Sequence, residues 1–127
     1  MKKVLVSLLF IAALASCKKE KTPLTKPYNI EYKIWGTPFS NLNASGIVTY
    51  VSKTSATTVG SVNNFGWNVA ESNWNLKVGD KVGFTASVAN FATYQASIIV
   101  DGAVVIFRNV AQTVPTTSNL KLSYTIE

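Results

Sequence analysis

The side chains that perform most protein chemistry are scarce in this chain of 127 residues. It contains no histidine and a single cysteine, Cys17. The composition therefore excludes imidazole general bases, histidine-dependent catalytic triads and histidine metal sites. One cysteine forms no disulfide within the chain, so Cys17 calls for another explanation.

Carboxylates are the remaining candidates for acid–base chemistry. Five lie beyond residue 27: Glu31, Glu71, Asp80, Asp101 and Glu127. Asp80 and Asp101 adjoin glycines in turn-like patterns, Glu127 is the last residue, and Glu31 falls within a strand pattern. The one carboxylate left, Glu71, does not make the pair that a glycosidase needs. With no glycine-rich phosphate loop either, we expect a protein that is not an enzyme and holds no metal or cofactor.

The amino-terminal residues have the parts of an export signal. Lys2 and Lys3 precede an apolar stretch over residues 4–15, which is shorter than the ~20 residues of a membrane span. The stretch ends in Leu14-Ala15-Ser16-Cys17, which resembles the lipobox of bacterial lipoproteins. The alternative is an ordinary secretory signal with an incidental cysteine, but a lipobox accounts for the lone thiol.

The lipobox implies that residues 1–16 are a signal peptide and that Cys17 carries the lipid anchor. Two or three acyl chains anchor a protein stably, because each buried CH₂ contributes ~0.8 kcal/mol. Residues 17–27, with two prolines, predict a flexible tether. Because Lys18-Lys19-Glu20 follows the anchor instead of an acidic run, we expect the periplasm-facing side of the outer membrane rather than the cell surface.

The net charge of +6 belongs mainly to the signal and the tether. From Tyr28 onward there are six basic and five acidic side chains and no basic run. The electrostatic footprint of a nucleic-acid-binding surface is therefore missing.

Residues 28–127 alternate with the period of β-strands. Ile30, Tyr32 and Ile34 alternate with Glu31 and Lys33, and similar patterns recur along the chain. Turn signals come every ten residues or so, and no helical pattern appears after the signal. These features predict one all-β domain, an immunoglobulin-like antiparallel β-sandwich of seven or eight strands.

The sharpest local prediction is a hairpin around Asp101-Gly102, with Val100 opposite Ala103. Continued regularly, this register places Ile98, Val105 and Phe107 inward and Ile99, Val104 and Ile106 outward, with Arg108 flanking the outer face. That outer face is unusually apolar. Either a neighbouring loop or the amino-terminal segment covers it, or it is a contact surface for a partner.

Three tryptophans offer further contact candidates. Trp67 is expected in the core, as is usual for a tryptophan in a β-sandwich. Trp35 shares its strand face with Glu31 and Lys33, which predicts an outward position. Trp74 stands among serine and asparagine and is expected in a polar loop. Trp35 and Trp74 are therefore the candidate contact tryptophans.

Several short motifs resemble the soluble domain of the mycobacterial membrane protein small family. They are Tyr32-Lys33-Ile34-Trp35-Gly36, Val48-Thr49-Tyr50, Gly66-Trp67-Asn68 and Ser97-Ile98-Ile99-Val100-Asp101-Gly102. The resemblance implies an immunoglobulin-like sandwich and an accessory role beside an export transporter of the resistance-nodulation-division class. It implies no catalytic residues. That family uses an uncleaved transmembrane helix, whereas this chain has a lipobox.

Three functions follow as hypotheses. The first is a non-enzymatic, lipid-anchored domain that contacts another envelope protein, such as a transporter. The second is a module that binds glycan or another small ligand through Trp35 or Trp74. The third is a purely structural envelope protein.

Overall fold

The computed structural model describes residues 24–54 and 56–127, which form eight β-strands. The strands are β1 (Lys26–Pro38), β2 (Ser45–Val51), β3 (Thr57–Val62), β4 (Trp67–Leu76), β5 (Lys81–Ala89), β6 (Phe91–Val100), β7 (Ala103–Ala111) and β8 (Thr117–Thr125). In these two ranges there is no helix that could cross a membrane.

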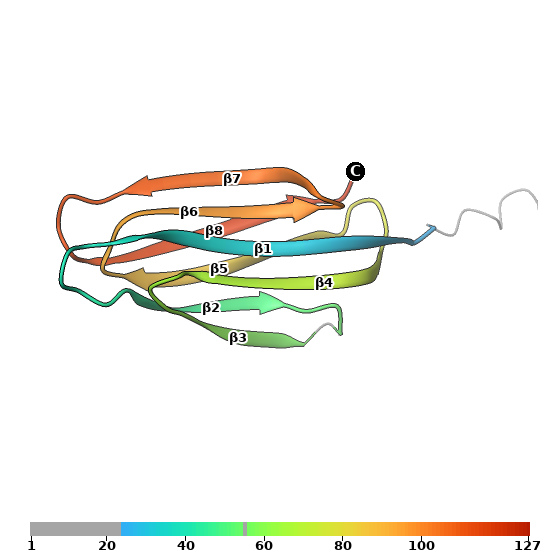
Figure 1. The fold of residues 1–127 in the computed structure, drawn as a ribbon. Coiled ribbons are helices and arrows are strands. Elements are labelled where there is room, and N and C mark those ends of the chain that lie inside the picture. The colour runs from blue at the N-terminus through green and yellow to red at the C-terminus, as the bar shows by residue number, and fades with distance from the viewer. Residues whose placement is uncertain (1–23, 55) are drawn as a thin grey trace, which may run out of the picture.

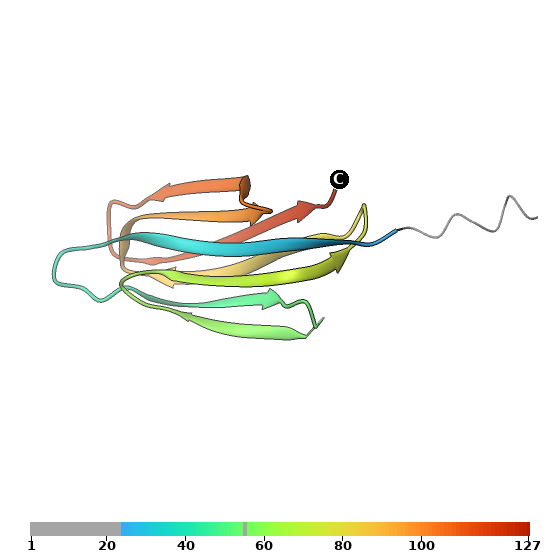
Figure 2. The same ribbon diagram turned by 45° about the vertical axis from the view of Figure 1, so that its right-hand side comes forward.

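The strands form two antiparallel sheets that lie face to face (Figures 1 and 2). Sheet A has the order β4-β1-β6-β7, and sheet B has the order β3-β2-β5-β8. Only the β2–β3 and β6–β7 connections stay within one sheet. The predicted all-β sandwich of seven or eight strands is confirmed.

The core lies between the two sheets, where the alternation places the apolar side chains. On β5, Val82, Phe84 and Val88 point inward and are buried, while Thr85 is exposed. On β1, Ile30, Tyr32 and Ile34 do the same from sheet A. Burial of each large apolar side chain contributes about 1.5–3 kcal/mol, so the alternation is the main determinant of the fold.

The first strand begins two residues before the predicted start of the domain at residue 28. Lys26 pairs with Leu76 and Pro27 pairs with Asn75 on β4. The signal peptide, the lipobox and Cys17 lie outside the described residues.

The β6–β7 hairpin confirms part of the predicted register and corrects the rest. Asp101 and Gly102 have φ of 48° and 82°, and Val100 lies opposite Ala103 as predicted. The register then shifts between Ile98 and Ile99, because Val105 is an extra residue on β7 and forms a β-bulge.

Beyond the bulge, the predicted faces of β7 are wrong. Ile106 lies opposite the buried Ile98 and packs against the core, where an outward position was predicted. Phe107, predicted to be core, is 53% exposed on the outer face. A shift of one residue exchanges the two faces of a strand, which accounts for both errors. Val104 precedes the bulge and points outward as predicted.

The predicted loop position of Trp74 is also wrong. Trp74 lies in β4 opposite Tyr28, is 9% exposed and belongs to the core. The neighbouring Asn73 has φ of 54°, at the point where the β1–β4 register shifts. That irregularity restores the inward alternation of Trp74 and Leu76 after a polar stretch. Trp67 packs against the core, as expected.

Candidate functional site

The outer face of sheet A carries two aromatic side chains around a buried serine. Ser97 of β6 lies between Lys33 of β1 and Phe107 of β7 in the strand register. The rings of Trp35 and Phe107 approach to 6.3 Å between centroids, although their strands are separated by β6. The aromatic pair therefore crosses β6 next to Ser97.

Ser97 shows how closely this face is covered. The residue is 1% exposed, and its Oγ has no hydrogen-bond partner among the described residues. The Ser97 hydroxyl is therefore shielded from solvent although it lies on the outer face of sheet A.

The apolar surface continues from this pair to the hairpin. Val104 is 59% exposed and lies opposite the partly buried Ile99. We call Trp35, Ile99, Val104 and Phe107 the sheet A patch. The ammonium nitrogen of Lys33 lies 5.2 Å from the centroid of the Trp35 ring, which adds a cation at the border of the patch.

The structure brings together only part of the predicted contact set. Trp35, Ile99 and Val104 share the patch, whereas Trp74 and Ile106 face the core. Arg108 is exposed but lies opposite Ala96, a core residue, so it is not aligned with the patch.

Phe107 completes the patch and was missed by sequence reasoning. No signal in the sequence would have identified it, because its outward position depends on the bulge.

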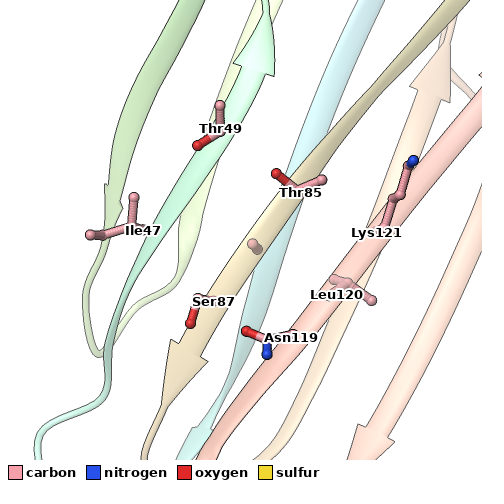
Figure 3. A pocket seen from close by; sticks show the side chains of 8 residues that line it. Ile47, Thr49, Thr85, Ser87, Asn119, Leu120 and Lys121 are labelled. Carbon is pink, nitrogen blue, oxygen red and sulfur yellow. The ribbon is translucent and has the colours of Figure 1, made fainter.

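The outer face of sheet B has a different chemistry. A hollow of about 590 Å³ lies over β2, β5 and β8 (Figure 3). Its side chains follow the cross-strand rows Thr49–Thr85–Lys121 and Ile47–Ser87–Asn119. The hollow offers hydroxyl, amide and ammonium groups, and no carboxylate lines it. It has hydrogen-bonding capacity but lacks the acid–base pair of a catalytic site.

Metal-binding groups do not gather in the part of the chain that is described. No cluster of three or more cysteine, aspartate or glutamate side chains occurs within residues 24–54 and 56–127. Among the described surfaces, the sheet A patch has the residue types most typical of binding sites.

Comparison with the models of known protein families finds no match to this chain, and comparison with curated protein sequences finds no significant match.

Proposed function

We propose that this protein is a non-enzymatic, lipid-anchored domain of the cell envelope that binds another envelope protein through the sheet A patch. The observation that carries the proposal is the apolar outer face of sheet A, where Phe107 and Val104 are more than half exposed and the Phe107 ring packs against that of Trp35. Exposed apolar groups that form one contiguous surface are typical of interaction sites.

The composition of the patch favours a protein partner. Aromatic residues are enriched at the centres of protein interfaces, and charged residues are found mostly at their rims. The patch follows this arrangement, with Trp35 and Phe107 together and Lys33 at the border. The lipobox at Cys17 supports an envelope location. The resemblance to the mycobacterial membrane protein small family suggests an export transporter as the class of partner.

Site-specific photocrosslinking in cells tests the proposal. A photoreactive phenylalanine analogue at Val104 or Phe107 is expected to capture one discrete envelope protein. The same analogue at Ile47 or Val59, which are exposed on sheet B, serves as the control and is expected to capture none. Equal crosslinking from both faces, or none from sheet A, would contradict the proposal.

A charge placed in the patch gives a second measurement. Val104→Lys is expected to abolish the crosslink from position 107, because burying an unpaired ammonium in the interface is costly. Val104 is exposed, so the melting temperature should stay near that of the wild type. A persistent crosslink would show that the partner binds elsewhere.

A further inference from the structure

A second, smaller hollow lies where the β3–β4 turn meets β1. Its volume is about 220 Å³, and its lining includes Lys33, Trp35, Asn63, Phe65 and Asn68. Trp35 thus borders both this hollow and the sheet A patch. Phe65 is 91% exposed, the highest value among the exposed large apolar side chains in the described residues.

The turn that carries Phe65 is tightly built. The backbones of Asn63 and Gly66 exchange two hydrogen bonds, of 3.3 and 2.9 Å, and the Phe65 N–H donates to Asn63 Oδ1 at 2.8 Å. Gly66 has φ of 96°, and a Cβ at this position would collide with the carbonyl oxygen of Ile34. Only glycine allows the turn to pack this closely against β1.

This geometry holds Phe65 beside Trp35 while its ring remains in water. A well-defined turn needs no exposed phenylalanine, since the contacts that shape it come from the backbone, Asn63 and Gly66. The backbone position from which the Phe65 ring projects is therefore fixed before any ligand arrives. Such preorganisation lowers the entropic cost of binding.

The loops at this end of the sandwich carry no charge. Residues 39–44, 63–66, 90 and 112–116 contain no acidic or basic side chain. Hydrogen bonds tie these loops together at one end of the sandwich: Asn64 Nδ2 donates to Asn43 Oδ1, Asn90 Nδ2 donates to Asn43 O, and Asn90 N donates to Thr116 O. This end lies opposite the end where β1 begins (Figure 1).

We propose that the hollow binds a neutral pyranose unit of a saccharide chain. The polarised C–H groups of a sugar ring complement the electron-rich face of an aromatic ring. The amides of Asn63 and Asn68 offer donors and an acceptor for adjacent hydroxyl groups, and Lys33 adds a further donor. Lys33 is the one charged side chain in the lining, and its ammonium is held over the Trp35 ring, so most of the hydrogen-bonding groups are uncharged amides, which suit a neutral ligand.

The hollow adjoins the sheet A patch through Trp35, but Phe65 and Asn68 lie outside the patch. The β3–β4 turn lies at the end of the sandwich away from the predicted anchor (Figure 1). A polymer can reach the hollow without meeting the tether, because the β3–β4 turn and the start of β1 lie at opposite ends of the sandwich (Figure 1).

Calorimetric titration of the full chain in mild detergent tests the inference. The probes are cellohexaose, xylohexaose, mannohexaose and chitohexaose, with a galacturonate hexamer as the acidic comparison. We expect at least one neutral oligosaccharide to bind, and we expect Phe65→Ala and Asn68→Ala each to weaken that binding about tenfold or more. Leu42→Ala, which removes an exposed side chain from another loop of the same end, is the matched control and should leave binding unchanged.

Three results would overturn the inference: no binding of any neutral oligosaccharide, binding unaffected by Phe65→Ala, or binding confined to the galacturonate hexamer. The two proposals fail separately. Phe65→Ala should retain the photocrosslink from position 107, and Val104→Lys should retain saccharide binding.

Discussion

At the scale of single residues, Tyr32 links the two sheets through the core. It is fully buried on β1, and its hydroxyl oxygen accepts a hydrogen bond of 3.1 Å from the backbone N–H of Gly83 on β5. Its ring lies 5.5 Å from that of Phe84 and 5.9 Å from that of Tyr50. Burial disfavours the phenolate and raises the pKa of Tyr32 to about 12.

This raised pKa predicts a loss of stability in alkaline solution. The unfolded chain releases the Tyr32 proton near pH 10, whereas the folded chain keeps it until about pH 12. The contribution of neutral Tyr32 to the free energy of unfolding is therefore complete below pH 10. It is lost as the pH rises toward 12, which lowers the free energy of unfolding by up to about 2–3 kcal/mol. Urea unfolding at several pH values measures the effect.

Tyr32→Phe is the control for this titration. It should lower the free energy of unfolding at pH 7 by about 1–3 kcal/mol, because the Gly83 N–H loses its partner. It should also lose less stability than the wild type between pH 10 and 12. An equal alkaline loss in both proteins would assign the effect to other groups.

At the scale of elements, the hairpin shows what a local pattern can and cannot predict. Asp101-Gly102 specified the turn and the first opposed pair, because both turn residues need positive φ. The bulge at Val105 has no comparable signal, since valine fits a regular strand equally well. Its position depends on how β6 and β7 pack within the sandwich, and the sequence does not show that packing.

The same limit applies to the candidate sites. The alternation of β1 predicted that Trp35 faces outward, since its neighbours on that face are polar. The surroundings of Trp35 could not be predicted, because Phe107 and Phe65 come from distant strands and turns. The polar neighbours of Trp74 are typical of a loop, so its strand could not be predicted from them. The irregularity at Asn73 appears only in the pairing of β4 with β1.

The bulge predicts losses of very different size for two residues that the regular register places in the core. Ile98→Ala should lower the free energy of unfolding by about 2–5 kcal/mol, because the fully buried side chain leaves a cavity. Phe107→Ala removes a larger side chain but should cost less than about 1 kcal/mol, because the ring is 53% exposed. Chemical denaturation compares the two. A larger loss of stability for Phe107→Ala would show that Phe107 is buried, as the regular register without the bulge predicts.

At the scale of the whole molecule, the lipid anchor at Cys17 remains a prediction from the sequence. Cys17→Ser should remove all incorporation of radiolabelled palmitate, because serine lacks the thiol that receives the diacylglycerol. The variant should accumulate as an unprocessed precursor or in soluble form. Label retained by the serine variant would show that the acyl chains are attached elsewhere.

The start of β1 connects the predicted tether to the rest of the domain. Asn29 exchanges hydrogen bonds with Asp101: its N–H donates to Asp101 Oδ1 at 2.9 Å, and its carbonyl accepts from the Asp101 N–H at 2.9 Å. Its side-chain oxygen also accepts from the Asn73 N–H at 3.2 Å. The residues that follow the tether thus hold the hairpin turn and the irregular part of β4.

We call the hydrogen bonds of Asn29 with Asp101 and Asn73 the Asn29 clamp. Two truncations separate the contribution of the predicted tether from that of this clamp. A chain that starts at residue 24 retains every described strand, so it should melt cooperatively with a circular dichroism spectrum typical of β-sheet. A chain that starts at residue 30 loses the hydrogen bonds of Asn29 and the packing of Tyr28 against the core, and its free energy of unfolding should be about 2–4 kcal/mol lower. If both chains are equally stable, the clamp contributes nothing. If the longer chain is already molten, residues before 24 or a partner must complete the core.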